Sequence, residues 1–174
     1  MTVEYCECAS PVGPIVVAVH DGQLCSLSFG EQWPRKRAQL EKRFGQVEFH
    51  EAADPAGVVT RLDKYFAGDL DALAGIVVDT GGTPFQQRVW SELRKIPVGR
   101  TVSYGDIARA IGAPTAVRAV GAANGANPVG IVVPCHRVIG TNGQLTGYGG
   151  GIERKRWLLA HEARWSKVTG DLFS

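Results

Sequence analysis

The sequence of 174 residues lacks the features of membrane-spanning and secreted proteins. No stretch approaches the roughly 20 uninterrupted apolar residues that a transmembrane helix needs, so we expect no membrane association. The first ten residues, MTVEYCECAS, contain no basic segment followed by an apolar run, which argues against a secretory signal. Cysteine is scarce, and the thiols of Cys6, Cys8, Cys25 and Cys135 therefore predict a cytoplasmic protein with reduced cysteines.

The sequence also has no internal repeat and no low-complexity tract. Hydrophobic residues make up 44% and charged residues 21% of the chain, which is ordinary for globular proteins and excludes fibrous and intrinsically disordered classes. The length suffices for one or two small domains with buried cores.

The net charge of +2 conceals an uneven distribution along the chain. Residues 1–84 carry seven Lys/Arg and twelve Asp/Glu, a balance of −5, whereas residues 85–174 carry twelve and five, a balance of +7. This asymmetry predicts that the second half meets a polyanion and that the first half does not. The alternative is solvated surface charge that happens to be unevenly spread.

Strand-like and helical segments alternate in the first half. Asp21-Gly22 separates two β-rich runs, and Asp-Gly is a strong hairpin signal. Asp54 precedes apolar residues at helical spacing and is a candidate N-cap. The predicted elements are strands at 12–19 and 23–29, helices at 33–44 and 54–67, and a strand at 75–79.

The string DTGGTP at 79–84 predicts a linker. It coincides with the change in the sign of the charge, so we place a structural domain at 1–78 and a second domain at 85–174. Thr83 is a candidate N-cap for the first helix of this second domain, with Pro84 at the first helical position.

Two short helices joined by a glycine-containing turn follow. We predict helices at 104–111 and 115–123, connected through Gly112, which is the outline of a helix-turn-helix. Arg118 is the only long polar side chain of the second helix, which otherwise consists mainly of small residues. Because base readout needs several donors and acceptors, this helix suits close approach to DNA of any sequence. Tight packing of small residues in a core is the alternative.

The segment IVVPCHRVI at 131–139 is the most informative one. We expect Ile131–Val133 to form a buried strand that Pro134 cannot continue, so that Cys135 lies where the strand ends. A thiol is nucleophilic only as a thiolate, which needs a nearby base or cation. His136 is the obvious base. Since neighbours on an extended chain point to opposite sides, it would act through a water molecule or be brought close by the bend at Pro134.

The predicted helix at 152–163 offers a third residue that would orient the histidine. By helical spacing Glu162 leans toward the apolar face, and a buried carboxylate is costly without a partner. Glu162, His136 and Cys135 would then form an orienter, a base and a nucleophile. The alternative is that Glu162 pairs with a surface arginine, while Cys135 is a small core residue and His136 a turn histidine.

The segment PCHRV at 134–138 resembles the active-site signature of the O6-alkylguanine-DNA alkyltransferases (methylated-DNA–protein-cysteine methyltransferases), and most of all their bacterial members. The resemblance covers residues 79–164 and is loose over 1–78. It implies an α+β fold with two domains: a small N-terminal antiparallel β-sheet with helices, similar to ribonuclease H, and a mostly helical C-terminal domain with a winged-helix-like helix-turn-helix. The further matching motifs are FQQRVW at 85–90, VSYG at 102–105, RAVG at 118–121, NP at 127–128, LTGY at 145–148 and WLLAHE at 157–162.

The resemblance also implies roles for the matching positions. Cys135 would accept the alkyl group after activation by His136 and Glu162, and Asn127 would hold the Cys135 turn and the helix-turn-helix together. Tyr104 would crowd the phosphate on the 3′ side of the target and help to protonate the departing guanine. The remaining positions would contact DNA (Arg118 inside the base stack, with Ala116, Ala119 and Gly121) or border the alkylated base (Pro134, Val138, Tyr148, the amide of Gly149, and Lys155).

The implied activity is direct reversal of DNA damage. The Cys135 thiolate would displace O6-alkylguanine, and O4-alkylthymine, at the alkyl carbon after the nucleotide has been flipped out of double-stranded DNA. The thioether product has no acceptable leaving group, so each molecule would react once. The resemblance implies no cofactor, binding in the minor groove with little sequence specificity, and a monomer that can bind DNA cooperatively.

Two other functions compete with this one. A damage-binding module of the alkyltransferase-like type would lack the acceptor cysteine, whereas Cys135 is present. A cysteine hydrolase that uses Cys135 and His136 would turn over, and it would need neither the helix-turn-helix nor Arg118.

A zinc site in the first domain is a separate alternative. Cys6, Cys8, His20 and Cys25 are a permitted mixture of structural zinc ligands. The gap between Cys6 and Cys8 is shorter than zinc sites usually have, so we expect core thiols, a hairpin histidine and no metal.

Overall fold

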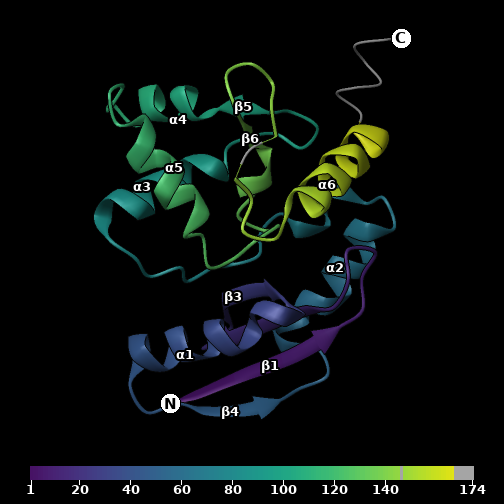
Figure 1. Cartoon of the computed structure of the whole chain (residues 1–174). Coiled ribbons are helices and arrows are strands. Elements are labelled where there is room, and N and C mark those ends of the chain that lie inside the picture. Colours follow the sequence, from purple (N-terminus) through teal and green to yellow (C-terminus); the bar gives the residue numbers. More distant parts are fainter. Residues whose placement is uncertain (146, 167–174) are drawn as a thin grey trace. The chain divides into compact units, whose positions relative to one another are not determined.

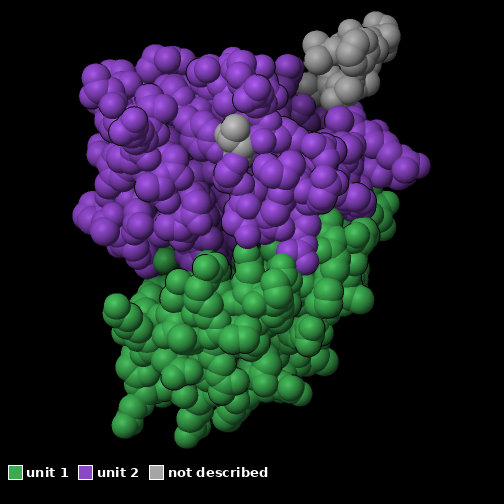
Figure 2. Space-filling model, in the orientation of Figure 1, with its two compact units in different colours: residues 1–80 green, residues 81–174 purple. Residues whose placement is uncertain are grey.

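A computed structural model describes residues 1–145 and 147–166 of the chain. The chain divides into two compact units, Met1–Thr80 and Gly81–Ser174 (Figure 2). Thr146 of the LTGY motif and residues 167–174, the end of the second predicted domain, lie outside the described residues. The first unit is built on a sheet with helices and the second is mainly helical, so the predicted α+β class is confirmed.

A four-stranded sheet is the centre of the first unit (Figure 1). Its strands β1 (Thr2–Cys8), β2 (Ile15–His20), β3 (Gln23–Phe29) and β4 (Glu48–Glu51) lie in the order β3-β2-β1-β4. β2 pairs antiparallel with β1 and β3, whereas β4 joins the edge parallel to β1. The sheet is therefore mainly antiparallel, as predicted, with one parallel pair. The chain reaches β4 through a helix, which supplies the long connection that a parallel pair requires.

The β2–β3 hairpin closes through the predicted Asp-Gly turn. Asp21 and Gly22 have φ angles of 49° and 74°, and a two-residue hairpin turn of this type needs positive φ at both positions. β2 begins at Ile15 rather than at Val12, because the chain turns before Pro14.

Helix α1 (Trp33–Phe44) covers one face of the sheet and has the predicted limits. Leu40 is buried in a cluster with Val3, Ala18 and Cys25, and Trp33 packs against the same cluster. This single stripe of apolar contacts fixes the helix to the sheet and leaves its other sides exposed.

Helix α2 (Val58–Phe66) is shorter than the predicted helix at 54–67. The preceding residues form a 3₁₀ turn in which Ala56 has a φ of 53° and Gly57 a φ of 72°, so an α-helix cannot begin before Val58. Asp54 nevertheless caps α2, because its carboxylate accepts the Val59 N–H at 2.7 Å.

The predicted strand at 75–79 is wrong. Val78 alone forms a bridge with Leu24, supported by hydrogen bonds from Leu24 N–H to the Val77 carbonyl and from Asp79 N–H to the Leu24 carbonyl. The apolar run lies beside β3, but only Val78 pairs with that strand.

The second unit holds four helices and a small parallel pair of strands among its described residues. Thr83 caps the first helix as predicted: its hydroxyl accepts the Gln86 N–H at 3.1 Å, and the Gln86 side chain accepts the Thr83 N–H at 3.0 Å. The elements are α3 (Pro84–Leu93), β5 (Val102–Ser103), α4 (Tyr104–Ala110), α5 (Val117–Gly125), β6 (Val138–Ile139) and α6 (Ile152–Trp165).

Helices α4 and α5 form the predicted helix-turn-helix (Figure 1), although α5 begins and ends two residues later than predicted. Gly112 takes a φ of 76° in the turn between them. The indole N–H of Trp90 on α3 donates to the Ala123 carbonyl on α5 at 2.8 Å, which fixes α5 against α3. No helix of the described residues combines the length and apolar character needed to cross a membrane.

Candidate active site and nucleic-acid interface

The apolar residues before the cysteine are buried as predicted but do not form a strand. Ile131 is 1% exposed and Val133 0% exposed. Ile131 has a φ of 67°, which is incompatible with a strand, and the Val133 N–H donates locally to the Val129 carbonyl at 3.0 Å. Short apolar runs look alike whether they form a strand or a buried loop, and here local hydrogen bonds replace a sheet partner.

Cys135 begins a 3₁₀ turn, Cys135–Arg137, rather than ending a strand. The residue is 7% exposed. Pro134 is buried just before the turn and accepts the Arg137 N–H through its carbonyl. The chain is thus not extended between Cys135 and His136. The backbone turns at this point, as the alternative of a bend at Pro134 allowed.

Two asparagines hold the loop and the turn in place. Asn127, on the loop after α5, donates to the Val133 carbonyl at 2.8 Å and accepts the Val129 N–H at 3.0 Å. Asn124, within α5 and 3% exposed, donates to the Cys135 carbonyl at 3.3 Å. Asn124 therefore forms a direct side-chain link between the helix-turn-helix and the cysteine turn. Sequence reasoning assigned this link to Asn127 and missed Asn124.

His136 and Glu162 lie in contact, with Nε2 2.9 Å from Oε2. Their side chains are 0% and 1% exposed. No described protein atom hydrogen-bonds the buried Nδ1 of His136. An ionised carboxylate can only accept, so Nε2 carries the proton in this contact. In the neutral imidazole, Nδ1 is then the atom with the lone pair that can accept a proton.

Arg137 is a second, unpredicted partner of Glu162. Its Nε donates to Oε1 at 2.8 Å and its Nη2 to Oε2 at 3.0 Å, while Nη1 donates to the Ile96 carbonyl after α3 at 2.9 Å. The alternative that Glu162 pairs with an arginine is thus correct in part, but Arg137 is buried and His136 shares the carboxylate. The sequence shows two basic residues together in PCHRV, and a buried carboxylate needs partners, but the spacing does not assign Arg137 to this carboxylate.

Burial alone would raise the pKa of Glu162, but the contacts with His136 and Arg137 outweigh it and hold the pKa well below its usual range. Glu162 is consequently ionised at neutral pH. The site therefore contains a fixed negative charge directly behind the imidazole.

Lys155 and Tyr148 lie within electrostatic range of Cys135. Lys155 is 0% exposed, and its Nζ donates to the Val138 carbonyl at 2.6 Å. Burial lowers the Lys155 pKa, and a Cys135 thiolate acts against that shift. Burial raises the pKa of Tyr148 well above its usual value, and the charge of Cys135 adds to the effect. Both side chains are therefore close enough to Cys135 to respond to the charge of its sulfur.

The carbonyls of Cys135 and Val138 already accept hydrogen bonds from the protein. The Cys135 carbonyl accepts from Asn124 and from the Val138 N–H, and the Val138 carbonyl accepts from Lys155. Gly149 is exposed, and a Cβ built on it would have no atom within 4 Å. The position thus has room for a larger side chain such as alanine or serine.

The outer face of α5 is smooth, as the sequence indicated. Arg118 and Ala119 are exposed, Ala116 just before the helix is half-buried, and Val117 is 41% exposed. A Cβ on Gly121 would lie 4.0 Å from the ring of Tyr104, which begins α4. The remaining side of α5 is buried through Val120, Ala123 and Asn124.

Three of the four residues considered for zinc contact backbone carbonyls instead. Cys25 donates to the Ala18 carbonyl at 3.3 Å, and Cys6 to the Ala53 carbonyl at 3.4 Å. Nδ1 of His20 lies 3.1 Å from the Thr2 carbonyl. Within residues 1–145 and 147–166, no group of three or more His, Cys, Asp or Glu side chains is arranged to hold a metal ion.

Comparison with known protein families assigns both units. Residues 4–80 match the model described as "6-O-methylguanine DNA methyltransferase, ribonuclease-like domain", and residues 84–164 match "6-O-methylguanine DNA methyltransferase, DNA binding domain". These descriptions agree with the fold expected for each half.

Similar proteins cover nearly the whole chain. The methylated-DNA–protein-cysteine methyltransferase of Salmonella typhimurium is 49% identical over 160 residues, 88% of this chain and 92% of its own. That of Mycobacterium bovis is 47% identical over 173 residues, 98% and 97% of the two chains. The crystal structure of Mycobacterium tuberculosis OGT in complex with DNA is similar over 100% of both chains, with a TM-score of 0.81 and 44% identity.

Proposed function

Because the chain belongs to the 6-O-methylguanine DNA methyltransferase family, we propose that it repairs alkylated DNA by transferring the alkyl group to Cys135. The observation that carries the proposal is the buried contact between His136 and Glu162, adjacent in the chain to a cysteine held in a turn. Curated relatives named methylated-DNA–protein-cysteine methyltransferase support the same chemistry.

The reaction is a displacement at carbon. The Cys135 thiolate attacks the alkyl carbon of O6-alkylguanine, an S–C bond forms and the C–O bond breaks. The electron pair of the broken bond leaves with the guanine, which takes up a proton. The thioether is stable, so one molecule repairs one base, and the transfer needs no cofactor because the thiolate is both nucleophile and acceptor.

His136 generates the thiolate as a general base. Its Nε2 is bound to Glu162 and its Nδ1 carries the free lone pair, so Nδ1 accepts the thiol proton through a bridging water. The ionised Glu162 stabilises the imidazolium that forms, as the third member of a nucleophile–base–orienter set does. Arg137 keeps Glu162 ionised and fixes its orientation.

The remaining site residues recognise the base and the leaving group. Tyr148 and the Gly149 amide border the base. Its amino group donates to the Val138 carbonyl, which has a second lone pair free, and to the Cys135 carbonyl in place of one of the two donors bound there. Lys155 adds positive charge where the guanine anion develops. Its contact with the Val138 carbonyl supports a place beside the base. Tyr104 crowds the 3′ phosphate and helps to protonate the departing guanine.

Helix α5 enters the minor groove of double-stranded DNA. Its smooth exposed face permits close approach without sequence specificity, and Arg118 replaces the flipped-out nucleotide in the base stack. A solved relative in complex with DNA supports DNA as the partner. The protein acts as a monomer in the cytoplasm, binds cooperatively on longer DNA, and also accepts O4-alkylthymine.

An intact-mass measurement tests the proposal. Protein incubated with an excess of O6-methylguanine duplex gains the mass of a single methyl group, peptide mapping locates it on Cys135, and repair stops at about one equivalent. Continued turnover, or methylation of Cys6, Cys8 or Cys25, would rule the proposal out.

A further inference from the structure

One helix of the first unit is opposite in charge to the rest of that unit. Residues 1–84 contain seven Lys/Arg, and five of them lie in α1 (Trp33–Phe44) beside a single acidic residue, Glu41. α1 thus has a balance of +4. The other residues of 1–84, with two Lys/Arg and eleven Asp/Glu, have a balance of −9. The total of −5 therefore hides a strongly basic helix on an acidic domain.

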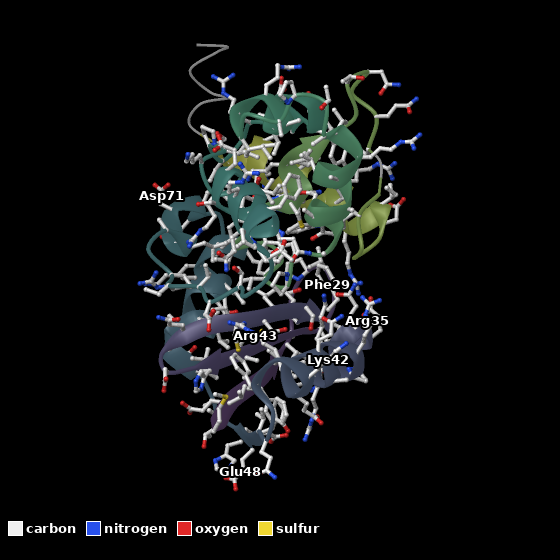
Figure 3. The ribbon with its side chains drawn as sticks, turned by 90° about the vertical axis from the view of Figure 1, so that its left-hand side faces the viewer. Phe29, Arg35, Lys42, Arg43, Glu48 and Asp71 are labelled. Carbon is white, nitrogen blue, oxygen red and sulfur yellow. The ribbon has the colours of Figure 1, made fainter. Side chains whose placement is uncertain are left out.

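The outer side of α1 presents two cations on one line. Leu40 faces the core, and at 3.6 residues per turn the side turned away from it carries Arg35, Gln39 and Lys42 beside Ala38. We call Arg35, Gln39 and Lys42 the basic stripe. All three are exposed. Arg35 and Lys42 are seven residues, or two turns, apart, which corresponds to about 10 Å along the helix. Figure 3 labels both on α1.

The cations of the basic stripe differ from the other arginines of α1. Arg37 lies 3.7 Å from Glu41 and stacks over the ring of Phe49, and Arg43 pairs with Asp79. By contrast, Arg35 and Lys42 form no hydrogen bond or ion pair within the part of the chain that the structure describes. Their charge is thus available to an external partner.

The position of Arg35 does not serve the stability of the helix, whereas Lys42 lies in the last turn, where the helix dipole favours a cation. Arg35 and Lys36 follow the N-terminus of α1, where the helix dipole is positive and acidic residues are favoured. The first turn contains no acidic residue, and no side chain caps it. A purpose other than folding accounts better for a basic first turn.

We propose that the basic stripe binds the phosphate backbone of double-stranded DNA, an inference that rests on the proposed function because it takes DNA as the substrate. A duplex carries one negative charge per about 1.7 Å of its axis, so two cations two turns apart find phosphates on any sequence. The exposed large hydrophobic residues in the described structure are Met1, Val77, Val117 and Trp165. None lies on α1, and a protein partner would need such apolar anchors.

The experiment measures how affinity for an undamaged duplex depends on salt. The duplex is several times longer than one binding site and is kept in excess, so that each DNA carries at most one protein. The double variant Arg35→Gln/Lys42→Gln should lower the slope of log K against log salt by about two, roughly one per cation. Gln39→Lys, which adds a cation to the basic stripe, should raise it by about one. Lys64→Gln, at an exposed position of α2, is the matched control and should leave the slope unchanged.

Two results would overturn the inference. One is a double variant whose slope equals that of the wild type. The other is a weakening of binding that occurs only with protein in excess, together with reduced cooperativity, since α1 would then bind a second copy of the chain. The rate of reaction with free O6-benzylguanine should be equal in all variants, which would show that the substitutions do not disturb the fold. Failure of the proposed function would give a different result. The wild type would then gain no methyl group, but the salt slopes on undamaged DNA would still differ between the variants as predicted here.

Discussion

Glu162 and His136 are 26 residues apart in sequence and meet at 2.9 Å in a region closed to solvent. Arg137, the neighbour of His136, holds the same carboxylate through two hydrogen bonds. One carboxylate therefore has two tasks. It orients the base of the proposed nucleophile, and it neutralises a buried guanidinium.

Substitutions of His136 and of Glu162 should slow methyl transfer through the loss of the same activating unit. We expect His136→Ala and Glu162→Gln each to slow single-turnover transfer, on the order of 10² or more. The double variant should be little slower than the worse single one, because residues that act as a unit are not additive. Rapid-quench kinetics of each variant measure this.

Glu153→Gln is the matched control for this comparison. Glu153 lies on the same helix, α6, but is exposed and pairs with Arg156 at the surface. Its transfer rate should equal that of the wild type. If the losses in transfer rate caused by the His136 and Glu162 substitutions multiply in the double variant, the two side chains do not form one activating unit.

Acid should destabilise the protein through Glu162. Because the folded-state pKa of Glu162 is depressed, its contribution to the free energy of unfolding is fully present above the ordinary value of 4.5 and decreases as the pH falls below it. Urea unfolding between pH 7 and pH 3 measures this dependence. Glu162→Gln should weaken the pH dependence of the free energy of unfolding. The pKa of Asp106 is also lowered, so the contribution of Asp106 to this dependence remains in both proteins.

The same variant should be less stable at neutral pH. Removing one partner of a buried ion pair typically costs about 3–5 kcal/mol, because Arg137 would remain buried without its carboxylate. Glu153→Gln should change the free energy of unfolding by less than about 1 kcal/mol. Equal stability of Glu162→Gln and wild type at pH 7 would contradict the assigned ion pair.

Local signals in the sequence predicted the elements that depend on local contacts. The predicted cap Thr83 bonds Gln86, three positions further on, and the predicted turn Asp21-Gly22 closes a hairpin through its own backbone angles. The burial of the apolar segment Ile131–Val133 was predicted, but its conformation was not, because an apolar run does not show whether it forms a strand or a loop with a positive φ at Ile131.

The sequence predicted those contacts of the site in which a residue's chemistry required a partner. It did not predict contacts for which several partners were available. Burial of Glu162 demanded a cation or a proton donor, which led to His136, but nothing in the spacing placed Arg137 on the same carboxylate. Asn127 and Asn124 are three residues apart in similar surroundings, and only the turn at Cys135 shows that Asn124 reaches its carbonyl. Summing charge over half of the chain likewise concealed the basic helix α1.

Asn124 should be a positioning residue for Cys135. Asn124→Leu removes the donor to the Cys135 carbonyl while keeping the branched shape of the buried side chain. We expect transfer from duplex DNA and from free O6-benzylguanine to slow alike, by about ten-fold, because small misplacement of a reacting atom is costly. Ala122→Ser, an exposed change on the same helix, is the control.

A purely structural effect of Asn124→Leu is distinguishable by thiol chemistry. If the variant only loosened the fold, Cys135 would become more accessible and react faster with a small alkylating reagent. A displaced but still buried Cys135 should keep its slow reaction with such a reagent and be impaired in transfer alone. Normal transfer rates on both substrates would remove Asn124 from the site.

Arg118 should act in nucleotide flipping rather than in ordinary phosphate binding. It is the only long polar side chain on the exposed face of α5, where small residues allow the helix to approach the DNA closely. Unstacking a nucleotide costs a few kcal/mol, so Arg118→Ala should slow duplex repair by about ten-fold or more at saturating protein. Reaction with free O6-benzylguanine, which requires no flipping, should remain near the wild-type rate.

Single-turnover repair at saturating protein separates the two roles. If Arg118 only bound a phosphate, Arg118→Ala would lower the salt slope by about one, and a higher protein concentration would restore the duplex rate. The absence of a flipping residue cannot be compensated in this way, since the impaired step follows binding. Arg100→Ala, an exposed arginine of the same unit, is the control for removal of one positive charge. Equally slowed reactions on duplex and free base would reject the flipping role, because they would indicate damage to the Cys135 site itself.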